Sequence, residues 1–247
     1  MASQILFVGH NAGYTGAPIV FLNFLKWFKK NCDIPFQIIL RRGGLLEGAF
    51  MSLAPVVTLD NGYIGFIERR LSFFGLEKIA EKIYQTRLKE KFRSGDFGLI
   101  YSNTVTNGHV LEALRHIDCP VITHVHELEY WIRNHMGLDK FNLVKANSHY
   151  FIAVSEAVRQ NLIKNHEIPE DEIEMINEFI PLVASNSVDT SFMGKRICDQ
   201  LNIPSEALIV GASGTTDWRK GPDLFIEMAQ RVIKRMDRLV YFLWVGG

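Results

Sequence analysis

A basic loop between an apolar strand and a helix is the part of this chain best suited to chemistry. Arg219 and Lys220 follow the apolar run Leu208–Ala212 and precede Pro222, a residue favoured at the first position of a helix. Unpaired N–H groups at a helix N-terminus attract anions, and two neighbouring cations add to that attraction. The spacing predicts a site for a diphosphate. The alternative interpretation is a solvated surface loop whose cations happen to precede a helix.

A glycine-bearing loop near the N-terminus is a second candidate for phosphate binding. The segment GHNAGYTGAP (Gly9–Pro18) follows an apolar strand and opens onto a helix. Ligands gather at the carboxyl ends of strands in doubly wound sheets, and glycine lets a backbone approach a phosphate closely. Gly9, Gly13 and Gly16 do not match the GxGxxG spacing, so a dinucleotide fingerprint is not supported. A plain tight turn is the alternative.

Two histidines and a glutamate stand at the end of another apolar strand. His124 and His126 are two residues apart, which places both rings on one face if the strand continues that far, and Glu127 follows directly. This pattern indicates either polar groups at the mouth of a cleft or ligands of a metal ion. Zinc needs at least three protein ligands, and the other histidines show no paired spacing such as HExxH. Histidines that only cap the strand end are the remaining alternative.

Ser155 and two glutamates complete the set of candidate polar residues. The segment AVSEAVRQNLI predicts a helix with Ser155 as its N-cap, and the same hydroxyl and free N–H groups could also serve a ligand. Glu170 and Glu178 lie in EDEIEMINE, which we interpret as a solvated acidic turn.

Short apolar strands that alternate with helices must position these residues, and this order is typical of a parallel sheet covered by helices. Between the first two strands, residues 18–30 are apolar on nearly all sides, which predicts a well-buried helix. The predicted strands are Ile5–Val8, Phe36–Leu40, Val56–Leu59, Leu99–Tyr101, Val121–His126, Phe151–Val154, Leu208–Ala212 and Leu239–Val245.

A stretch of small polar residues, Pro181–Ser191, lacks periodicity and predicts a domain boundary. We therefore expect an α/β chain with a Rossmann-like, doubly wound domain in residues 1–185. Residues 186–247 form the second unit, with a predicted helix at Pro222–Met236 between two strands. One βαβ unit is small for a domain, so we expect this second unit to be incomplete.

Residues 76–92 carry apolar side chains at three- and four-residue spacing, which predicts an amphipathic helix. Its other face is basic: between Phe66 and Arg93 there are eight cations and four glutamates, a net charge of +4. Such a face is suited to an anionic membrane surface. A solvated helix with internal ion pairs is the alternative.

Composition narrows the class of protein. The chain has 247 residues, 47% of them hydrophobic, and zero formal net charge, so the global basic character of a nucleic-acid binder is absent. Cys32, Cys119 and Cys198 fit neither a disulfide framework nor a CxxC site, which favours a reducing compartment. Neither a signal peptide nor a run of about 20 apolar residues is visible, so we expect a cytoplasmic protein, peripheral to the inner face of the membrane if the basic helix binds it.

Taken together, these segments resemble the family 4 glycosyltransferases, retaining enzymes of the two-domain GT-B architecture. GTTDWRKGPDLF (Gly214–Phe225) is similar to the family's strand, basic "KG" loop and helix, and AVSEAVRQNLI to its "VSE" helix. TGAPIVFLNFL and HVHE are similar to the glycine loop and to the strand that ends in a cleft histidine. In the family, an acceptor-side N-terminal domain and a donor-side C-terminal domain close over a nucleotide sugar.

The resemblance implies roles for individual residues. Lys220 with Arg219 would neutralise the donor diphosphate, and Gly16 would admit a phosphate close to the first helix. His126 would be the catalytic-site histidine near the transferred sugar. Asn177, which matches the asparagine of an "NG" turn, and Ser155 would lie on the donor side. No metal or other cofactor is then expected.

The sequence departs from the family in three places. Thr215 and Thr216 stand where the family often has an arginine, and Glu178 stands where the "NG" glycine is usual. The family's two glutamates seven residues apart lie downstream of the "KG" loop, beyond Gly247. We therefore expect a glycosyltransferase represented by its N-terminal domain and the start of its donor domain, and inactive as a fragment.

The expected partners are a nucleotide-sugar donor and a glycan, a lipid-linked molecule or a small molecule as acceptor, with no nucleic acid. Two alternatives remain open. One is a non-catalytic nucleotide or nucleotide-sugar binding module. The other is a zinc hydrolase built on His124, His126 and Glu127.

Overall fold

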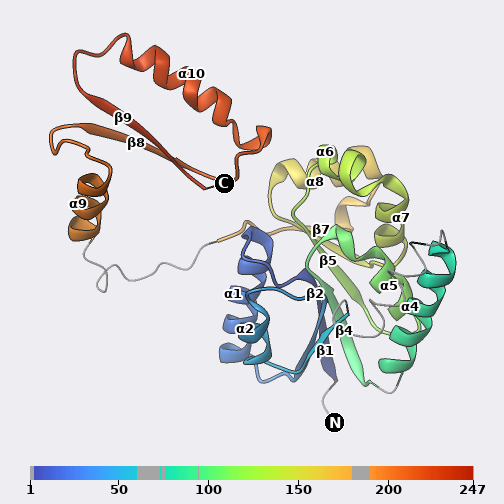
Figure 1. The fold of residues 1–247 in the computed structure, drawn as a ribbon. Coiled ribbons are helices and arrows are strands. Elements are labelled where there is room, and N and C mark those ends of the chain that lie inside the picture. Colours follow the sequence, from blue (N-terminus) through green and yellow to red (C-terminus); the bar gives the residue numbers. More distant parts are fainter. Residues whose placement is uncertain (1–2, 60–72, 74–75, 94, 180–189, 247) are drawn as a thin grey trace. The chain divides into compact units, whose positions relative to one another are not determined.

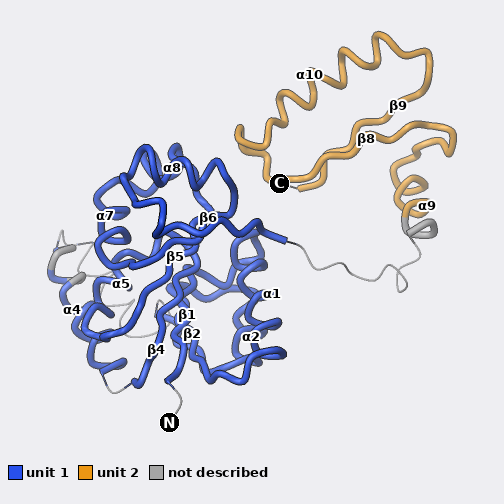
Figure 2. The backbone as a smooth tube through the Cα atoms, turned by 180° about the vertical axis from the view of Figure 1, so that it is seen from behind, with its two compact units in different colours: residues 1–181 blue, residues 182–247 orange. Residues whose placement is uncertain are grey.

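The computed structural model describes residues 3–59, 73, 76–93, 95–179 and 190–246. The chain forms two compact units, Met1–Pro181 and Leu182–Gly247, which Figure 2 shows in different colours. The predicted boundary segment 181–191 lies mostly outside the described residues, and helix α9, Thr190–Gln200, begins within it. The acceptor-side and donor-side roles of the two domains stay predictions.

Unit 1 is built on a seven-stranded parallel sheet in the order β3-β2-β1-β4-β5-β6-β7. The predicted Rossmann-like, doubly wound fold class is thus confirmed. Runs of β-branched and aromatic residues form the strands, as predicted. They are β1 Gln4–Asn11, β2 Phe36–Arg42, β3 Val56–Thr58, β4 Phe97–Ser102, β5 Val121–Val125, β6 Tyr150–Ala153 and β7 Ile173–Met175.

The seventh strand corrects the interpretation of EDEIEMINE as an acidic turn only. A short 3₁₀ turn, η3 Glu170–Glu172, leads into β7, which pairs with β6 at the edge of the sheet. Ile173 is the only buried residue of this three-residue strand. A short edge strand with one apolar anchor has too little alternation to be recognised from sequence.

Helices cover both faces of this sheet (Figure 1). Successive strand residues alternate between two apolar clusters: Ile5 and Phe7 pack with helices α1 and α2, whereas Leu6 and Val8 face the cluster formed with α4, α5, α7 and α8. The helices are α1 Gly16–Asn31, α2 Glu47–Met51, α4 Glu77–Lys91, α5 Gly108–Leu114, α6 Glu129–Trp131, α7 Leu138–Ala146 and α8 Glu156–His166.

Two helix predictions have different outcomes. The amphipathic helix predicted at residues 76–92 is confirmed as α4, with Tyr84 and Leu88 buried. Helix α1 forms where predicted, but the expectation that it is buried on nearly all sides is wrong. Phe21 and Leu25 are buried, whereas the Trp27 side chain is 53% exposed. The reason is that α1 packs on one face of the sheet only, and its other side faces solvent.

Unit 2 contains a parallel pair of strands, β8 Leu208–Ser213 and β9 Val240–Val245, joined through helix α10, Pro222–Ile233. The predicted strand, basic loop, helix and strand are therefore confirmed. Phe225 of α10 packs edge-on against Phe242 and Trp244 of β9. Of the side chains described in residues 194–246, only Ile203 is buried.

A search of the described residues finds no helix with the length and apolar character that crossing a bilayer requires.

Candidate functional site

The strand order of unit 1 reverses direction between β1 and β4, which are neighbours in the sheet but not in sequence. In doubly wound sheets a crevice forms at this point, beyond the carboxyl ends of the strands. The end of β1 and the loops that follow β4, β5, β6 and β7 bring polar side chains to this end of the sheet. These side chains are His10, Asn103, Thr104, His126, Glu127, Ser155, Asn177 and Glu178.

His126 lies at the centre of a hydrogen-bonded chain in this region. Its Nδ1 atom is 2.5 Å from Oε1 of Glu178, and its Nε2 atom is 3.3 Å from Oδ1 of Asn103. The amide of Asn103 donates in turn to the carbonyl of Ala17 in the first turn of α1, at 3.4 Å. The His126 side chain is only 10% exposed. These contacts join the ends of β7, β5 and β4 to the start of α1.

Glu178 therefore corrects a second part of the acidic-turn interpretation. Its carboxylate is not simply solvated, because it contacts a histidine 52 residues away in sequence. Glu170 does behave as predicted, since it is 70% exposed and pairs with Arg159 at the surface. Nothing in the local pattern distinguishes the two glutamates. Only the pairing of β7 with β6 carries Glu178 towards His126.

Glu127 has a structural task that the sequence did not reveal. Its Oε1 atom accepts a hydrogen bond from the hydroxyl of Thr104, and its Oε2 atom accepts one from the backbone N–H of His126 at 3.0 Å. Both carboxylate oxygens are thus engaged in holding the loop after β5 against the loop after β4. Glu127 in this arrangement restrains the backbone at His126 and is not placed as a free base.

The prediction that His124 and His126 share one face is confirmed by ring centroids 4.3 Å apart. The Nδ1 atom of His124 is 2.7 Å from the hydroxyl of Tyr101. Burial lowers the pKa of His124 to about 3, and burial also raises the pKa of Tyr101. His124 is therefore a neutral ring under His126. Among the residues that the structure describes, no group of three His, Cys, Asp or Glu side chains is arranged to hold a metal ion.

His10, at the end of β1, was not singled out from the sequence. Burial first, and then the charges of Arg41, His126 and Arg42, lower its pKa to about 4. The guanidinium of Arg41 is held in place by donating to the carbonyl of Thr106 at 2.5 Å. This end of the sheet thus combines neutral histidine with fixed positive charge. The one sequence signal for His10 was its position directly after the first strand, within the glycine loop.

Gly16 and Ser155 lie at the N-termini of two helices. Gly16 is the first residue of α1, and Ser155 is the N-cap of α8. Gly16 begins α1 and is exposed, and a Cβ atom placed there would meet no atom within 4 Å. Packing in the chain itself therefore gives no reason for glycine. Ser155 caps α8 by accepting from the N–H of Val158 at 3.3 Å, as predicted. Asn177 lies exposed after β7. Ligand contacts of all three residues stay predictions.

In unit 2, the basic loop treats its two cations differently. The carboxylate of Asp217 accepts from the backbone N–H of Arg219 at 2.9 Å and from the guanidinium Nη2 at 2.9 Å. It also accepts from the hydroxyl of Thr215 at 3.0 Å. The hydrogen bonds from Arg219 are the main cause that holds the pKa of Asp217 down at about 2. Arg219 is therefore fixed by an ion pair within the loop.

Lys220 has no such partner: in the described part of the chain, no carboxylate lies within ion-pair distance of its ammonium group. Its aliphatic stem lies over Gly214, because a Cβ atom on Gly214 would be 3.2 Å from Cγ of Lys220. Gly214 also has a φ of +155°, which favours glycine. The glycine at the end of β8 thus makes room for the lysine stem.

The start of α10 beside Lys220 has no side-chain cap. Gly221 occupies the N-cap position with a φ of +67°, a left-handed conformation that glycine adopts without strain, and Pro222 follows. The indole N–H of Trp244 donates to the carbonyl of Gly214 at 3.0 Å and fixes the loop after β8. Uncapped N–H groups and the Lys220 ammonium are therefore both presented at the carboxyl end of β8, which is the arrangement predicted for an anion site.

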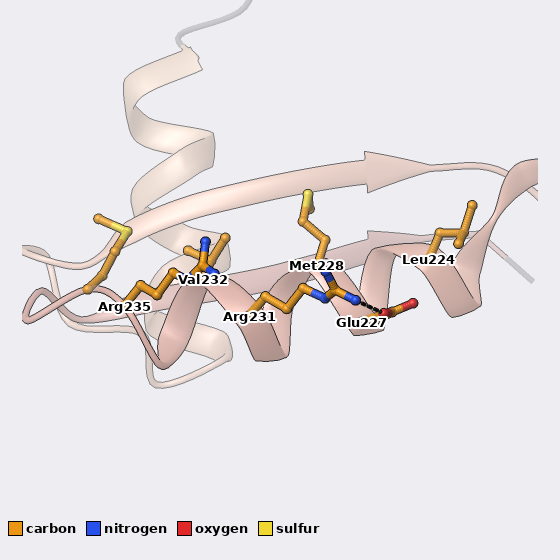
Figure 3. Close-up of a pocket in the computed structure, with 7 residues that line it drawn as sticks. Leu224, Glu227, Met228, Arg231, Val232 and Arg235 are labelled. Atoms are coloured by element: carbon orange, nitrogen blue, oxygen red, sulfur yellow. Dashed lines mark hydrogen bonds and ion pairs between the residues drawn. The ribbon is translucent and has the colours of Figure 1, made fainter.

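A groove along α10 is a different feature (Figure 3). Leu224, Met228 and Val232 line it together with an ion pair in which Arg231 donates to Glu227 at 2.5 Å. No nucleophile, histidine or unpaired acid lies among the residues that line it. The groove therefore offers apolar contact and no chemistry.

Comparison with solved structures shows a shared fold. HepE from Anabaena, crystallised in complex with UDP, matches with a TM-score of 0.66 and 18% identity over 98% of this chain and 69% of HepE. A glycosyltransferase from Rickettsia africae matches with a TM-score of 0.72 and 16% identity over 100% of this chain and 61% of its own. The chain thus spans about two thirds of the length of these proteins.

The same fold also occurs in enzymes of another reaction class. The UDP-GlcNAc 2-epimerase from Methanocaldococcus jannaschii matches with a TM-score of 0.58 and 13% identity over 97% of this chain and 65% of the epimerase. No curated protein sequence matches this chain significantly. Fold alone therefore does not choose between sugar transfer and epimerisation.

A comparison of sequence with family models gives a further finding. The sequence model of Glycosyltransferase Family 4 matches residues 56–183, which is just over half of the chain and runs from β3 to two residues beyond the end of unit 1. This stretch contains Asn103, His126, Ser155 and Glu178. The chain belongs to Glycosyltransferase Family 4.

Proposed function

We propose that this protein contributes to the transfer of a sugar from a nucleoside diphosphate sugar to an acceptor, with retention of configuration. In this proposal unit 1 is the acceptor-side domain and unit 2 belongs to the donor-binding domain. The observation that carries the proposal is the Lys220 ammonium, which has no carboxylate partner in the described chain and stands beside the uncapped N-terminus of α10. The UDP complex of HepE, a protein of the same fold, supports a nucleoside diphosphate as the ligand.

Charge development explains why these groups suit the reaction. When the bond from the sugar to the diphosphate breaks, negative charge accumulates on the leaving phosphate. Cations and N–H groups that are already in position stabilise this charge more in the transition state than in the ground state, and so lower the barrier. Lys220 supplies a flexible point charge, whereas Arg219 is held by Asp217. The proposal requires no metal ion for this neutralisation.

In unit 1 we assign His126 to the transferred sugar. Its buried ring is held between the loops after β4 and β7, so it offers a hydrogen-bonding group at a defined position. Gly16, at the exposed start of α1, leaves space for a phosphate to approach the helix N-terminus closely. Ser155 and Asn177 line the same end of the sheet and complete the proposed donor-side set.

The first prediction tests the anion site. Lys220→Ala should weaken binding of UDP by roughly 10- to 100-fold, because it removes one charge-assisted hydrogen bond to a phosphate. Binding is measured by isothermal titration calorimetry with the 247-residue chain. Lys234→Ala is the matched control, since Lys234 is exposed at the other end of the same helix.

In a protein with an intact donor-binding domain, assayed with a known acceptor, Lys220→Ala should also abolish sugar transfer. The circular dichroism spectrum of that variant should stay unchanged, because the fold is intact. Equal UDP affinity in the Lys220 and Lys234 variants, or undiminished transfer by Lys220→Ala, would count decisively against this assignment of the basic loop.

The acceptor and the place of action form the second part of the proposal. We propose a glycan, a lipid-linked molecule or a small molecule as acceptor, and peripheral contact of α4 with the cytoplasmic face of a membrane. Two features of α4 support this contact. Ile79 is 50% exposed, and Lys82 lies next to it along the same shallow surface.

A further inference from the structure

We infer that Glu178 is a positioning residue for His126: its carboxylate holds the ring proton on Nδ1 and sets the direction of Nε2. The contact that assigns this task is the distance of 2.5 Å between His126 Nδ1 and Glu178 Oε1. The value of this positioning for sugar transfer rests on the proposed function, whereas the proton position itself does not.

Hydrogen-bond chemistry determines which atom carries the proton. An ionised carboxylate has no hydrogen to donate, so a hydrogen bond with Glu178 requires an N–H group at Nδ1 of His126. The tautomer of a histidine is set by the partners of its two ring nitrogens. Nε2 faces Oδ1 of Asn103, which is also an acceptor, because the amide nitrogen of Asn103 donates to the carbonyl of Ala17 in the first turn of α1. This second contact is therefore a hydrogen bond only when Nε2 carries a proton as well.

Glu178 is the carboxylate that contacts the His126 ring. Glu127 is the other acid adjacent to His126, and both of its oxygens accept hydrogen bonds elsewhere, from Thr104 and from the His126 backbone. Glu178 reaches His126 across the end of β6, because β6 lies between β5 and β7 in the sheet. The backbone N–H of Ile176 donates to the carbonyl of Ala153 at 3.0 Å and anchors the approach.

The contact between Glu178 and His126 affects the ring strongly because the ring is shielded from water. The His126 side chain is 10% exposed and the Glu178 side chain 40% exposed, so water reaches the glutamate more easily than the ring. A buried ring nitrogen without a partner costs free energy. If Glu178 is removed, the remaining acceptor is Oδ1 of Asn103, which lies 3.3 Å from Nε2. The proton is then expected to move from Nδ1 to Nε2.

The experiment is nitrogen NMR of the 247-residue chain labelled with ¹⁵N-histidine and recorded at pH 8. A His126→Gln variant identifies the His126 signals by their loss. In the unaltered protein we expect His126 to carry a proton on Nδ1. Glu178→Ala should move it to Nε2, and Glu178→Gln, which keeps an oxygen acceptor, should restore it to Nδ1.

Glu174→Ala is the matched control, because Glu174 is an exposed glutamate of β7. It should leave the His126 signals unchanged. A neutral ring protonated only on Nε2 in the unaltered protein would overturn the inference, and so would an unchanged ring in Glu178→Ala. The first of these outcomes does not depend on the folding of the Glu178 variants.

UDP binding measured on the same samples separates this inference from the proposed function. If the chain does not bind UDP but the proton moves as expected, the proposed function is contradicted and Glu178 still positions His126. If UDP binds and the proton does not move, the donor site stands and the role of Glu178 is wrong.

Discussion

Single residues with the same chemistry take different tasks in this protein. Arg219 and Lys220 are adjacent cations, yet Asp217 holds the first and leaves the second without an ion pair among the described residues. Glu127 and Glu178 are both close to His126, but the first holds its backbone and the second its ring. These assignments follow from which partner lies within hydrogen-bond distance, a property that residue type alone does not define.

Gly16 gives a prediction at the residue scale. Gly16→Ala should leave the melting temperature unchanged or slightly raised, because its Cβ atom meets nothing within 4 Å and alanine favours a helix more than glycine. UDP binding should nevertheless weaken, since the added methyl group occupies the space through which a phosphate approaches the start of α1. Thermal unfolding and calorimetry measure the two effects.

The control for this experiment is Gly48→Ala. Gly48 lies in α2, is exposed, and likewise has no atom within 4 Å of a built Cβ. Gly48→Ala should likewise leave the melting temperature unchanged or slightly raised, and it should leave UDP affinity unchanged. The same UDP affinity for Gly16→Ala and the unaltered protein would show that close phosphate approach at Gly16 is not used.

At the scale of elements, helix termini and helix faces carry the proposed functions. Helix α10 offers an uncapped N-terminus behind Gly221, whereas α8 has its N-terminus capped by Ser155. Helix α4 buries Tyr84 and Leu88 against the sheet and leaves Ile79 exposed. Because α4 is covered by the sheet on one face and exposes an apolar side chain on the other, its exposed face is suited to contact a membrane.

For α4 we predict binding to anionic lipid. The chain should sediment with vesicles that contain phosphatidylserine and not with vesicles of phosphatidylcholine alone. Lys82→Glu should weaken this binding by at least about fivefold, because one basic residue near an anionic surface is worth about 1 kcal/mol. Lys164→Glu makes the same charge change at an exposed position of α8 and should have little effect.

Three outcomes would rule out α4 as the membrane contact. The chain would fail to bind anionic vesicles, its binding would be insensitive to salt, or Lys82→Glu and Lys164→Glu would weaken binding equally. The acceptor would then be sought among water-soluble molecules.

At the scale of the whole molecule, the stability of the fold in acid depends on two partly buried histidines at the end of the sheet. His124 has its pKa lowered from 6.5 to about 3, and His10 from 6.5 to about 4, in both cases mainly by burial. Between pH 6.5 and the lowered pKa of each histidine, the unfolded chain binds a proton that the folded chain does not. Stability is therefore present above pH 6.5 and falls as pH decreases towards 3, by up to about 1.4 kcal/mol per pH unit for each histidine.

Urea unfolding at pH 7 and pH 5, followed by circular dichroism, measures this dependence. The unaltered protein should unfold at lower urea concentration at pH 5. His124→Gln removes one of the two titrating rings and should show a smaller difference between the two pH values, whatever its stability at pH 7. An identical pH dependence in both proteins would mean that His124 is not a source of the acid sensitivity.

Much of the architecture was accessible from local pattern. The predicted strands and the helices α1, α4 and α10 all form, because runs of apolar residues at period two or period three to four have few other ways to be buried. The pattern failed for β7, where Ile173 is the one buried residue, and for α1, where Trp27 faces solvent. In both cases the number of neighbours that cover an element, and not its composition, decides its burial.

The sequence by itself determined the order of elements, the Ser155 cap, the shared face of His124 and His126, and the placement of Lys220 before a helix. These features depend on residues at most a few positions apart, whose relation the backbone geometry imposes. Only the tertiary structure decided that Glu178 contacts His126, that Glu127 accepts a hydrogen bond from Thr104, and that His10 is partly buried near Arg41. Such contacts join residues on different strands, and their partners are selected by strand order and register, which no local pattern specifies.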